Sequence, residues 1–333
     1  MTCIFEDTFL FSSRFLSLSL HFLTSLEIPI HLFGVWLIYT KTPKTMNSAK
    51  SSIMQLHIAC SIMDFYLSFL LVFYIWMPSP AGVPVGFMTM IGVSSVIQLF
   101  MGCIILTTVA LTIVASFENR YDALVIGQIG RSSTRNFKRI AYFSLNGILS
   151  LFYILYVFWV FPNAEQARKK TLERQPCIPK DLENHRMYVN MNTDNPNIPI
   201  MTFTMIILIN LQGSYFFFYT IYYLFFSVRN VSKATQSIQR KFFVAMTLQA
   251  FIPMAAFVGP LFYCYLVFMY NYYNQMYNNF AMIFICVHGL LTTIVMILAH
   301  SPYRNFVCGV LGKGRDVMGS SRVFTRNQTR VVN

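Results

Sequence analysis

Seven long apolar segments, separated by shorter polar ones, set the pattern of the chain. Each is longer than the roughly 20 residues that a helix needs to cross the hydrocarbon core of a bilayer. They cover residues 15–39, 51–76, 85–117, 140–161, 200–226, 242–270 and 280–300. The pattern predicts an all-α integral membrane protein built as a bundle of seven transmembrane helices.

The composition agrees with this prediction. The chain is 56% hydrophobic and 11% charged, whereas soluble domains carry about 25% charged residues. No internal repeat or low-complexity linker divides the chain. We therefore predict an extracellular N-terminus over residues 1–14, a seven-helix domain over 15–300, and a cytoplasmic tail over 301–333 that can begin with a short amphipathic helix.

The positive charges fall mainly on one side of the predicted membrane. Of the 25 Lys and Arg residues, 18 lie after the first, third and fifth segments or in the tail. The positive-inside rule then places the N-terminus outside and the C-terminus in the cytoplasm. The connector 163–200 carries six bases and opposes the rule locally. Because the net charge of +13 follows membrane topology, nucleic acid is excluded as a partner.

Short motifs along the whole bundle resemble those of the nematode serpentine receptor class H family. The motifs are IPIHLFG (28–34), KTPKTM (41–46), LH (56–57), MD (63–64), AGVPVG (81–86), FENRY (117–121), PCIP (176–179), QRKFF (239–243), QAFIP (249–253), YYNQMYNN (272–279), HG (288–289) and HSPYR (300–304). The resemblance implies a G-protein-coupled chemosensory receptor in the plasma membrane or the cilium of a sensory neuron. Its expected partners are a small-molecule ligand, a heterotrimeric G protein and the lipid bilayer.

The third apolar segment ends in Glu118, Asn119, Arg120 and Tyr121. This is where rhodopsin-like receptors have an acidic-Arg-Tyr triplet, whose Arg can pair with the acid at rest and meet a G protein when helix 6 moves outward. Here Asn119 separates the acid from the Arg. We expect these four residues to couple to the G protein, together with Arg240 and Lys241. The alternative is an interfacial Arg that only anchors a helix end.

Two acids lie within the predicted spans. Asp64 lies near the middle of the second segment, and Glu27 lies at a comparable depth in the first. A lone carboxylate at that depth is costly, so both should face the interior of the bundle. The pair could share a proton or bind sodium. A polar network without an ion explains them equally well.

Ligand binding is expected in the half of the bundle that faces outside. The polar candidates there and in the middle of the bundle are Gln98, Asn210, Gln212, Tyr263, Tyr265 and His288. No Lys or Arg lies within the spans where an anion would need one. A neutral or weakly polar small molecule with aromatic walls around it is predicted.

The cysteines give two candidates for covalent modification. Cys177 lies on the predicted outer side, where it can form a disulfide with Cys3, Cys264 or Cys286, or stay free. Cys308 follows the seventh segment next to the membrane, where acylation is common. No CxxC or HExxH pattern occurs, so neither a metal site nor another cofactor is expected.

A small-solute channel or transporter is the alternative function. Transporters commonly show internal repeats, broken helices and clusters of intramembrane charge. This sequence has no visible repeat and only two intramembrane acids, which favours the receptor. No apolar segment offers a hydrolase motif with partners at a matching depth, so the chain is not expected to be an enzyme.

Overall fold

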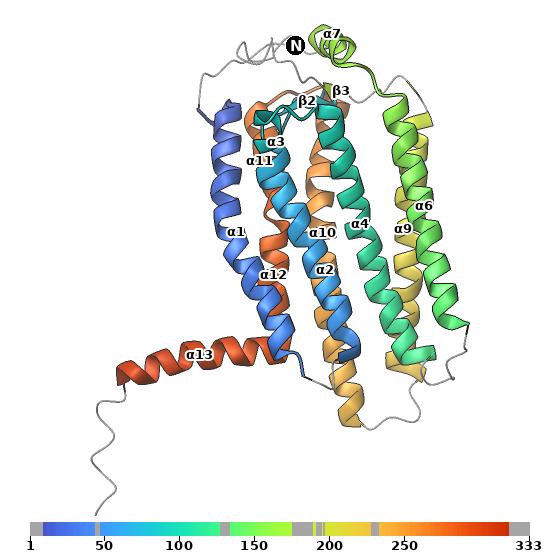
Figure 1. Ribbon diagram of the computed structural model, residues 1–333, viewed down its shortest axis with the longest axis vertical. Coiled ribbons are helices and arrows are strands. Elements are labelled where there is room, and N and C mark those ends of the chain that lie inside the picture. Colours follow the sequence, from blue (N-terminus) through green and yellow to red (C-terminus); the bar gives the residue numbers. More distant parts are fainter. Residues whose placement is uncertain are drawn as a thin grey trace, which may run out of the picture.

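The computed structural model describes residues 9–43, 47–126, 134–174, 189–190, 195, 197–227 and 233–319. Within these residues, seven helices are long and apolar enough to cross a membrane. They run side by side as one bundle (Figure 1). The predicted seven-helix membrane architecture is thus confirmed.

The bundle helices follow the chain in order. They are α1 (Ser13–Lys41), α2 (Asn47–Phe65) with the π-helix η3 (Tyr66–Leu71), α4 (Ser95–Tyr121) with η4 (Asp122–Ile126), α6 (Arg135–Trp159), α9 (Asn197–Tyr222) with η5 (Tyr223–Ser227), α10 (Lys233–Tyr270), and α11 (Gln275–Cys286) with α12 (His288–Ala299). Shorter elements are η1 (Phe9–Phe11), α3 (Phe87–Met90), α7 (Ala164–Arg174), β1 (Phe73–Ile75), β2 (Ala81–Pro84) and β3 (Val189–Asn190). A further helix, α13 (Ser301–Gly319), follows the bundle.

Polar side chains fix where several helices begin. Ser12 accepts a hydrogen bond from the backbone N–H of Phe15 at the start of α1. Ser94 and Asn274 make the same type of contact at the starts of α4 and α11. Each caps a backbone donor that has no partner within its own helix.

Two predicted segments, 51–76 and 85–117, are wrong at the ends that face each other. The second helix ends at Leu71, because Val72 adopts a left-handed conformation with φ of 40°. The residues that follow form the β1–β2 hairpin. The third helix begins only at Ser95, after Gly92 with φ of 83° breaks the backbone. Hydropathy recognised the break at 77–84 but missed its full length, because residues 72–76 and 85–94 are as apolar as the helices around them.

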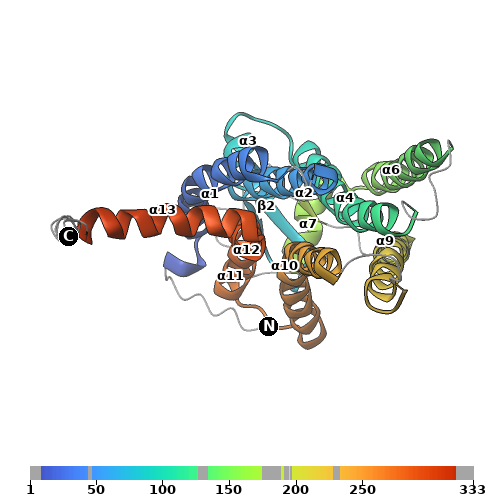
Figure 2. The same cartoon turned by 90° about the horizontal axis from the view of Figure 1, so that it is seen from below.

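The helix α4 occupies the centre of one half of the bundle. It packs against α2, α6, α9 and α10. Figure 2 shows α6 and α9 at the periphery, on the far side of α4 from α1. The seventh span is divided at Val287, between α11 and α12, and α12 packs against α1, α2 and α10.

The two ends of the bundle differ in structure. At one end, which we call the capped end, β1, β2 and β3 form an antiparallel sheet that lies across the helices (Figure 1). Trp76 and Val83 in this hairpin are completely buried. The other end, which we call the basic end, carries Lys41, Lys50, Arg120, Arg135, Lys138, Arg139, Arg240, Lys241 and Arg304. There α13 runs outward from the bundle, at a steep angle to the other helices (Figure 1).

Candidate functional site

Arg120 lies in the last turn of α4 and turns toward α10. Its guanidinium carbon is 3.5 Å from the centre of the Phe242 ring. Phe242 itself is buried. No carboxylate in the described part of the chain lies within ion-pair distance of Arg120. A cation–π contact with the sixth span therefore holds this arginine.

His300, the first residue after the last span, packs against the same phenylalanine. Its ring lies 5.2 Å from the ring of Phe242 and 5.5 Å from that of Tyr303. Burial, and then the positive charge of Arg120, lower the pKa of His300 to about 4. A neutral imidazole is therefore favoured beside the guanidinium at physiological pH. We call Arg120, Phe242 and His300 the arginine cluster.

The acids next to Arg120 are held by a different helix. Arg135 donates to Glu118 at 2.7 Å and to Asp122 at 2.8 Å. Arg139 donates to the same two carboxylates, at 2.9 Å and 3.4 Å. Positions 118 and 122 share one face of a helix, whereas position 120 points elsewhere. Glu118 therefore does not pair with Arg120 as the acid does in the rhodopsin-like triplet, and the two acids tie α4 to α6 instead.

Asn119 and Tyr121 contact two further helices. Asn119 donates to the Ser52 hydroxyl on α2 at 2.7 Å and also accepts from Arg139. The Tyr121 ring lies 5.3 Å from the ring of Tyr219 on α9. Four successive residues of α4 thus contact α6, α2, α10 and α9. The end of α4 is a junction for most of the basic end.

The last two coupling candidates lie at the start of the sixth span. Arg240 donates twice to the backbone carbonyl of Leu224, at 3.1 Å and 3.0 Å, and so binds the end of the fifth span. Lys241 is exposed. The structure therefore brings all six predicted coupling residues to the basic end, and Phe242, Arg135, Arg139 and His300 join them. Sequence reasoning missed these four because none stands out from its neighbours in the chain.

Asp64 is completely buried between two histidines from other helices. Its carboxylate oxygens lie 3.2 Å from Nε2 of His31 on α1 and 3.1 Å from Nδ1 of His288 on α12. These two contacts are within ion-pair distance. Neither Asp64 oxygen forms a hydrogen bond with a described residue. Nδ1 of His31 also lies 3.0 Å from the hydroxyl of Thr293. These residues form a polar cluster that links α1, α2 and α12, and we call it the Asp64 cluster.

Glu27 belongs to the edge of this cluster. Ser68 donates to its carboxylate at 3.2 Å and also contacts the backbone carbonyl of Asp64 at 2.7 Å. Ser68 thus links the Glu27 carboxylate to the backbone of Asp64, whereas histidines surround the Asp64 carboxylate. Within the described residues, no group of His, Cys, Asp and Glu has the arrangement of a metal site. Sodium binding at Asp64 stays a prediction.

The six ligand-binding candidates do not come together. Gln98 is buried at the α3–α4 corner, where it contacts Thr89 and the Val93 carbonyl. His288 belongs to the Asp64 cluster. Gln212 bonds to Tyr142 and Asn146 of α6, whereas Asn210 and Tyr265 are exposed on the outside of the bundle. Helical rotation, which the sequence does not fix, separates them.

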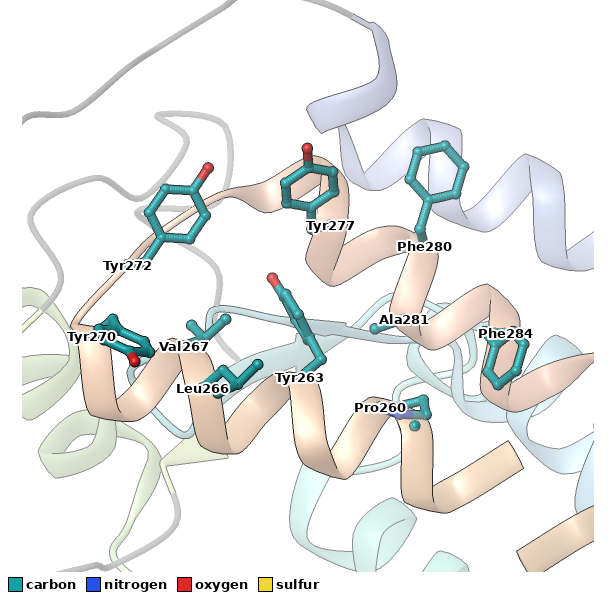
Figure 3. Close-up of a pocket in the computed structure, with 11 residues that line it drawn as sticks. Pro260, Tyr263, Leu266, Val267, Tyr270, Tyr272, Tyr277, Phe280, Ala281 and Phe284 are labelled. Atoms are coloured by element: carbon teal, nitrogen blue, oxygen red, sulfur yellow. The ribbon is translucent and has the colours of Figure 1, made fainter. Parts of the chain in front are cut away.

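The sixth candidate, Tyr263, lines a groove between α10 and α11. The groove has a volume of about 770 Å³ and lies near the capped end. Its lining residues are Gly259, Pro260, Tyr263, Leu266, Val267, Tyr270, Tyr272, Tyr277, Phe280, Ala281 and Phe284. Figure 3 shows Tyr263 rising from α10 into the space beside Ala281 of α11. We call this cavity the α10–α11 groove.

Three of the cysteines considered for modification lie within the described residues. Cys264 and Cys286 carry free thiols in the structure, and the disulfide of Cys177 stays a prediction. Cys177 and Cys3 lie outside the described residues. Cys308 is exposed on α13, near Phe306, whose ring lies 4.1 Å from the Lys41 ammonium. Acylation of Cys308 stays a prediction.

The fold defines a membrane protein of the seven-helix class. Residues 11–313 match the family described as the serpentine type 7TM GPCR chemoreceptor Srh. The chain is 27% identical to Serpentine receptor class H-72 of Caenorhabditis elegans over 320 residues, which cover 94% of this chain and 90% of that protein. The chain belongs to the Srh chemoreceptor family, as its motifs predicted. This is a family of chemoreceptors and not of enzymes.

Proposed function

We propose that this protein is a chemosensory receptor that activates a heterotrimeric G protein. A small molecule binds in the half of the bundle near the capped end, which faces outside. The G protein binds at the basic end, in the cytoplasm. The receptor acts in the plasma membrane, and its membership of a chemoreceptor family favours the sensory cilium as the place. It catalyses no reaction and requires no cofactor.

The contact between Arg120 and Phe242 carries this proposal. It joins the third span to the sixth, and the sixth is the helix that moves outward in rhodopsin-like receptors. Movement of Phe242 would remove the ring from the guanidinium and leave Arg120 without a partner. A G protein that accepts hydrogen bonds from Arg120 would stabilise the open state. The ligand and the G protein then bias the same two-state equilibrium.

Nucleotide exchange on a purified G protein tests the proposal. The full-length receptor is reconstituted in lipid nanodiscs and exposed to a panel of neutral volatile and water-soluble odorants. An active odorant should accelerate exchange with the wild-type receptor. Arg120→Ala should abolish this acceleration while odorant binding is retained, because the arginine contacts the G protein and not the ligand.

The matched control removes another arginine from the same end. Arg304 is exposed and donates to the Leu298 carbonyl at 2.9 Å, so Arg304→Ala should retain exchange. If Arg120→Ala also retains full exchange, Arg120 is only a membrane anchor and the proposal fails. Odorant-evoked current across a bilayer without any G protein would instead identify a channel.

A further inference from the structure

The α10–α11 groove opens on the outside of the bundle, toward the membrane. Phe280 and Phe284 in its wall are 45% and 52% exposed, although they lie within a span. A surface of this kind in a transmembrane segment faces lipid. The groove is therefore accessible from the bilayer.

The sheet at the capped end favours this sideways route over one along the bundle axis. The side-chain amide of Gln275 donates to the Ile75 carbonyl at 3.0 Å, and that of Asn278 donates to the Met77 carbonyl at 3.3 Å. Asn279 fastens the N-terminal segment by donating to the Leu10 carbonyl at 2.8 Å. These amides, which lie on the first turns of α11, tie the β1–β2 hairpin and η1 to the bundle.

The lining of the groove indicates the chemistry of its ligand. None of the lining residues is charged, and apolar and aromatic side chains form most of the wall. A volume of about 770 Å³ is within the range of pockets that hold small molecules. An ion would lose its hydration in such a site without gaining a partner. The ligand must therefore be neutral.

The hydroxyl of Tyr263 defines the ligand further. It donates its hydrogen to the Asn278 side-chain oxygen at 2.9 Å. That amide oxygen can only accept, so the tyrosine oxygen keeps lone pairs that can accept a hydrogen bond. A ligand that meets it must carry a donor. An alcohol group on an apolar body satisfies both the wall and this oxygen.

We propose that the α10–α11 groove binds a neutral alcohol with an aliphatic or aromatic body, which enters sideways from the bilayer. The inference rests on the proposed receptor function and names its ligand class. The same helix α10 carries Tyr263 in the groove and Phe242 in the arginine cluster. The two residues lie roughly 30 Å apart at about 1.5 Å per helical residue. An alcohol seated between α10 and α11 can thus bias the position of Phe242.

Photolabelling tests the site without any G protein. The probe is an eight-carbon alcohol that carries a diazirine, added to the full-length receptor in phosphatidylcholine nanodiscs. Adducts are located by peptide mass spectrometry. Labelling of residues 259–284 should saturate as the probe concentration rises. Labelling of Trp159, which is 88% exposed on α6, should rise in proportion to the concentration. Groove labelling that follows Trp159 would overturn the proposal.

Competition tests the ligand class. Unlabelled 1-octanol in tenfold excess should reduce groove labelling several-fold, whereas octane and octanoate should reduce it little. Equal competition by octane would show that the hydroxyl is not recognised and would overturn the alcohol assignment. Competition by octanoate as strong as that by 1-octanol would overturn the neutral-ligand argument.

Two variants localise the effect. Ala281→Trp fills the groove and should remove the saturable labelling, whereas Ala141→Trp makes the same change at an exposed position of α6 and should not. Tyr263→Phe keeps the shape of the wall, and it should weaken competition by 1-octanol roughly two- to tenfold, the effect of one lost hydrogen bond. This variant decides the outcome if Ala281→Trp fails to fold. Saturable labelling without nucleotide exchange would support the ligand site and contradict the proposed receptor function. Nucleotide exchange without saturable labelling would support the receptor function and contradict the ligand site.

Discussion

Gly289 shows how a single residue permits the Asp64 cluster to form. A Cβ atom at this position would lie 1.3 Å from the Asp64 carboxylate oxygen. Only glycine therefore lets α12 approach α2 closely enough for His288 to reach Asp64. The carboxylate cannot simply move away, because it is completely buried and His31 lies on its other side.

Gly289→Ala should therefore destabilise the receptor. Overpacking of this kind costs about 1–3 kcal/mol, and the thermal unfolding midpoint of the purified protein should fall accordingly. Gly147→Ala is the matched control, because a Cβ at Gly147 on α6 would meet no atom within 4 Å. Equal midpoints for the two variants would show that α12 has room beside Asp64. Asp64→Ser should partly rescue Gly289→Ala, since the smaller side chain makes space for the new methyl group.

At the scale of elements, the end of α4 separates two tasks that neighbouring residues perform. Glu118 and Asp122 face α6 and hold its first turns through Arg135 and Arg139. Arg120 faces α10. An acid two positions from the arginine lies on another face of the helix and cannot pair with it. Because Asn119 stands where an adjacent acid would, the acids contact α6 and Arg120 contacts α10 separately. Under the proposed function, only the contact with α10 acts as the switch.

Glu118→Gln and Phe242→Leu should then have different effects. Glu118→Gln leaves buried hydrogen bonds incomplete and should destabilise the protein by roughly 1–3 kcal/mol without raising basal exchange. Phe242→Leu removes the aromatic face, a contact worth about 1–2 kcal/mol when it is shielded from water. Basal nucleotide exchange should therefore rise several-fold, as the open state gains population.

Basal exchange and thermal stability of the two purified variants are measured side by side. Phe225→Leu is the matched control for Phe242→Leu, because Phe225 stacks on Arg240 at 4.4 Å and not on Arg120. Higher basal exchange from Glu118→Gln than from Phe242→Leu would contradict the assignment. The acid would then be the restraint on Arg120, as in rhodopsin-like receptors.

At the scale of the whole molecule, the two ends of the bundle are chemically different. One end is closed over by a buried apolar sheet, and the other gathers arginines and lysines around α4 and α10. Positively charged connectors are retained on the cytoplasmic side of membranes. This asymmetry supports the proposed orientation, with the capped end outside and the G protein at the basic end.

Epitope tags on the two termini check the orientation. An N-terminal tag should bind antibody on intact cells, whereas a C-terminal tag should bind it only after the membrane is permeabilised. A tag in the connector 127–133 should behave like the C-terminal one, because η4 and α6, which it joins, meet it with the ends that lie at the basic end. The opposite staining pattern would reverse the orientation and with it the proposed sides for ligand and G protein.

The family, the number of spans and most of their bounds follow from the sequence. Long apolar segments must become helices in a bilayer, since their backbone groups have no water to bond with. The local motifs are short and lie in order along the chain, so they identify the family without a structure. The same logic fails between residues 72 and 94. There residues 72–76 and 85–94 are apolar as well, but Val72 and Gly92 leave the helical region and the β1–β2 hairpin pairs its own backbone groups.

For the candidate sites, the sequence predicted how deep each residue lies in the membrane but not which helices it contacts. Arg120 and Asp64 stand out because charge is rare in an apolar segment, and the sequence by itself placed them at a membrane boundary and in the interior. Only the tertiary structure decided their partners, Phe242 and the two histidines, which lie far away in the chain. The physical reason is that hydropathy fixes how deep a residue lies, while the rotation of each helix fixes what it touches. That rotation depends on packing contacts such as the close approach at Gly289.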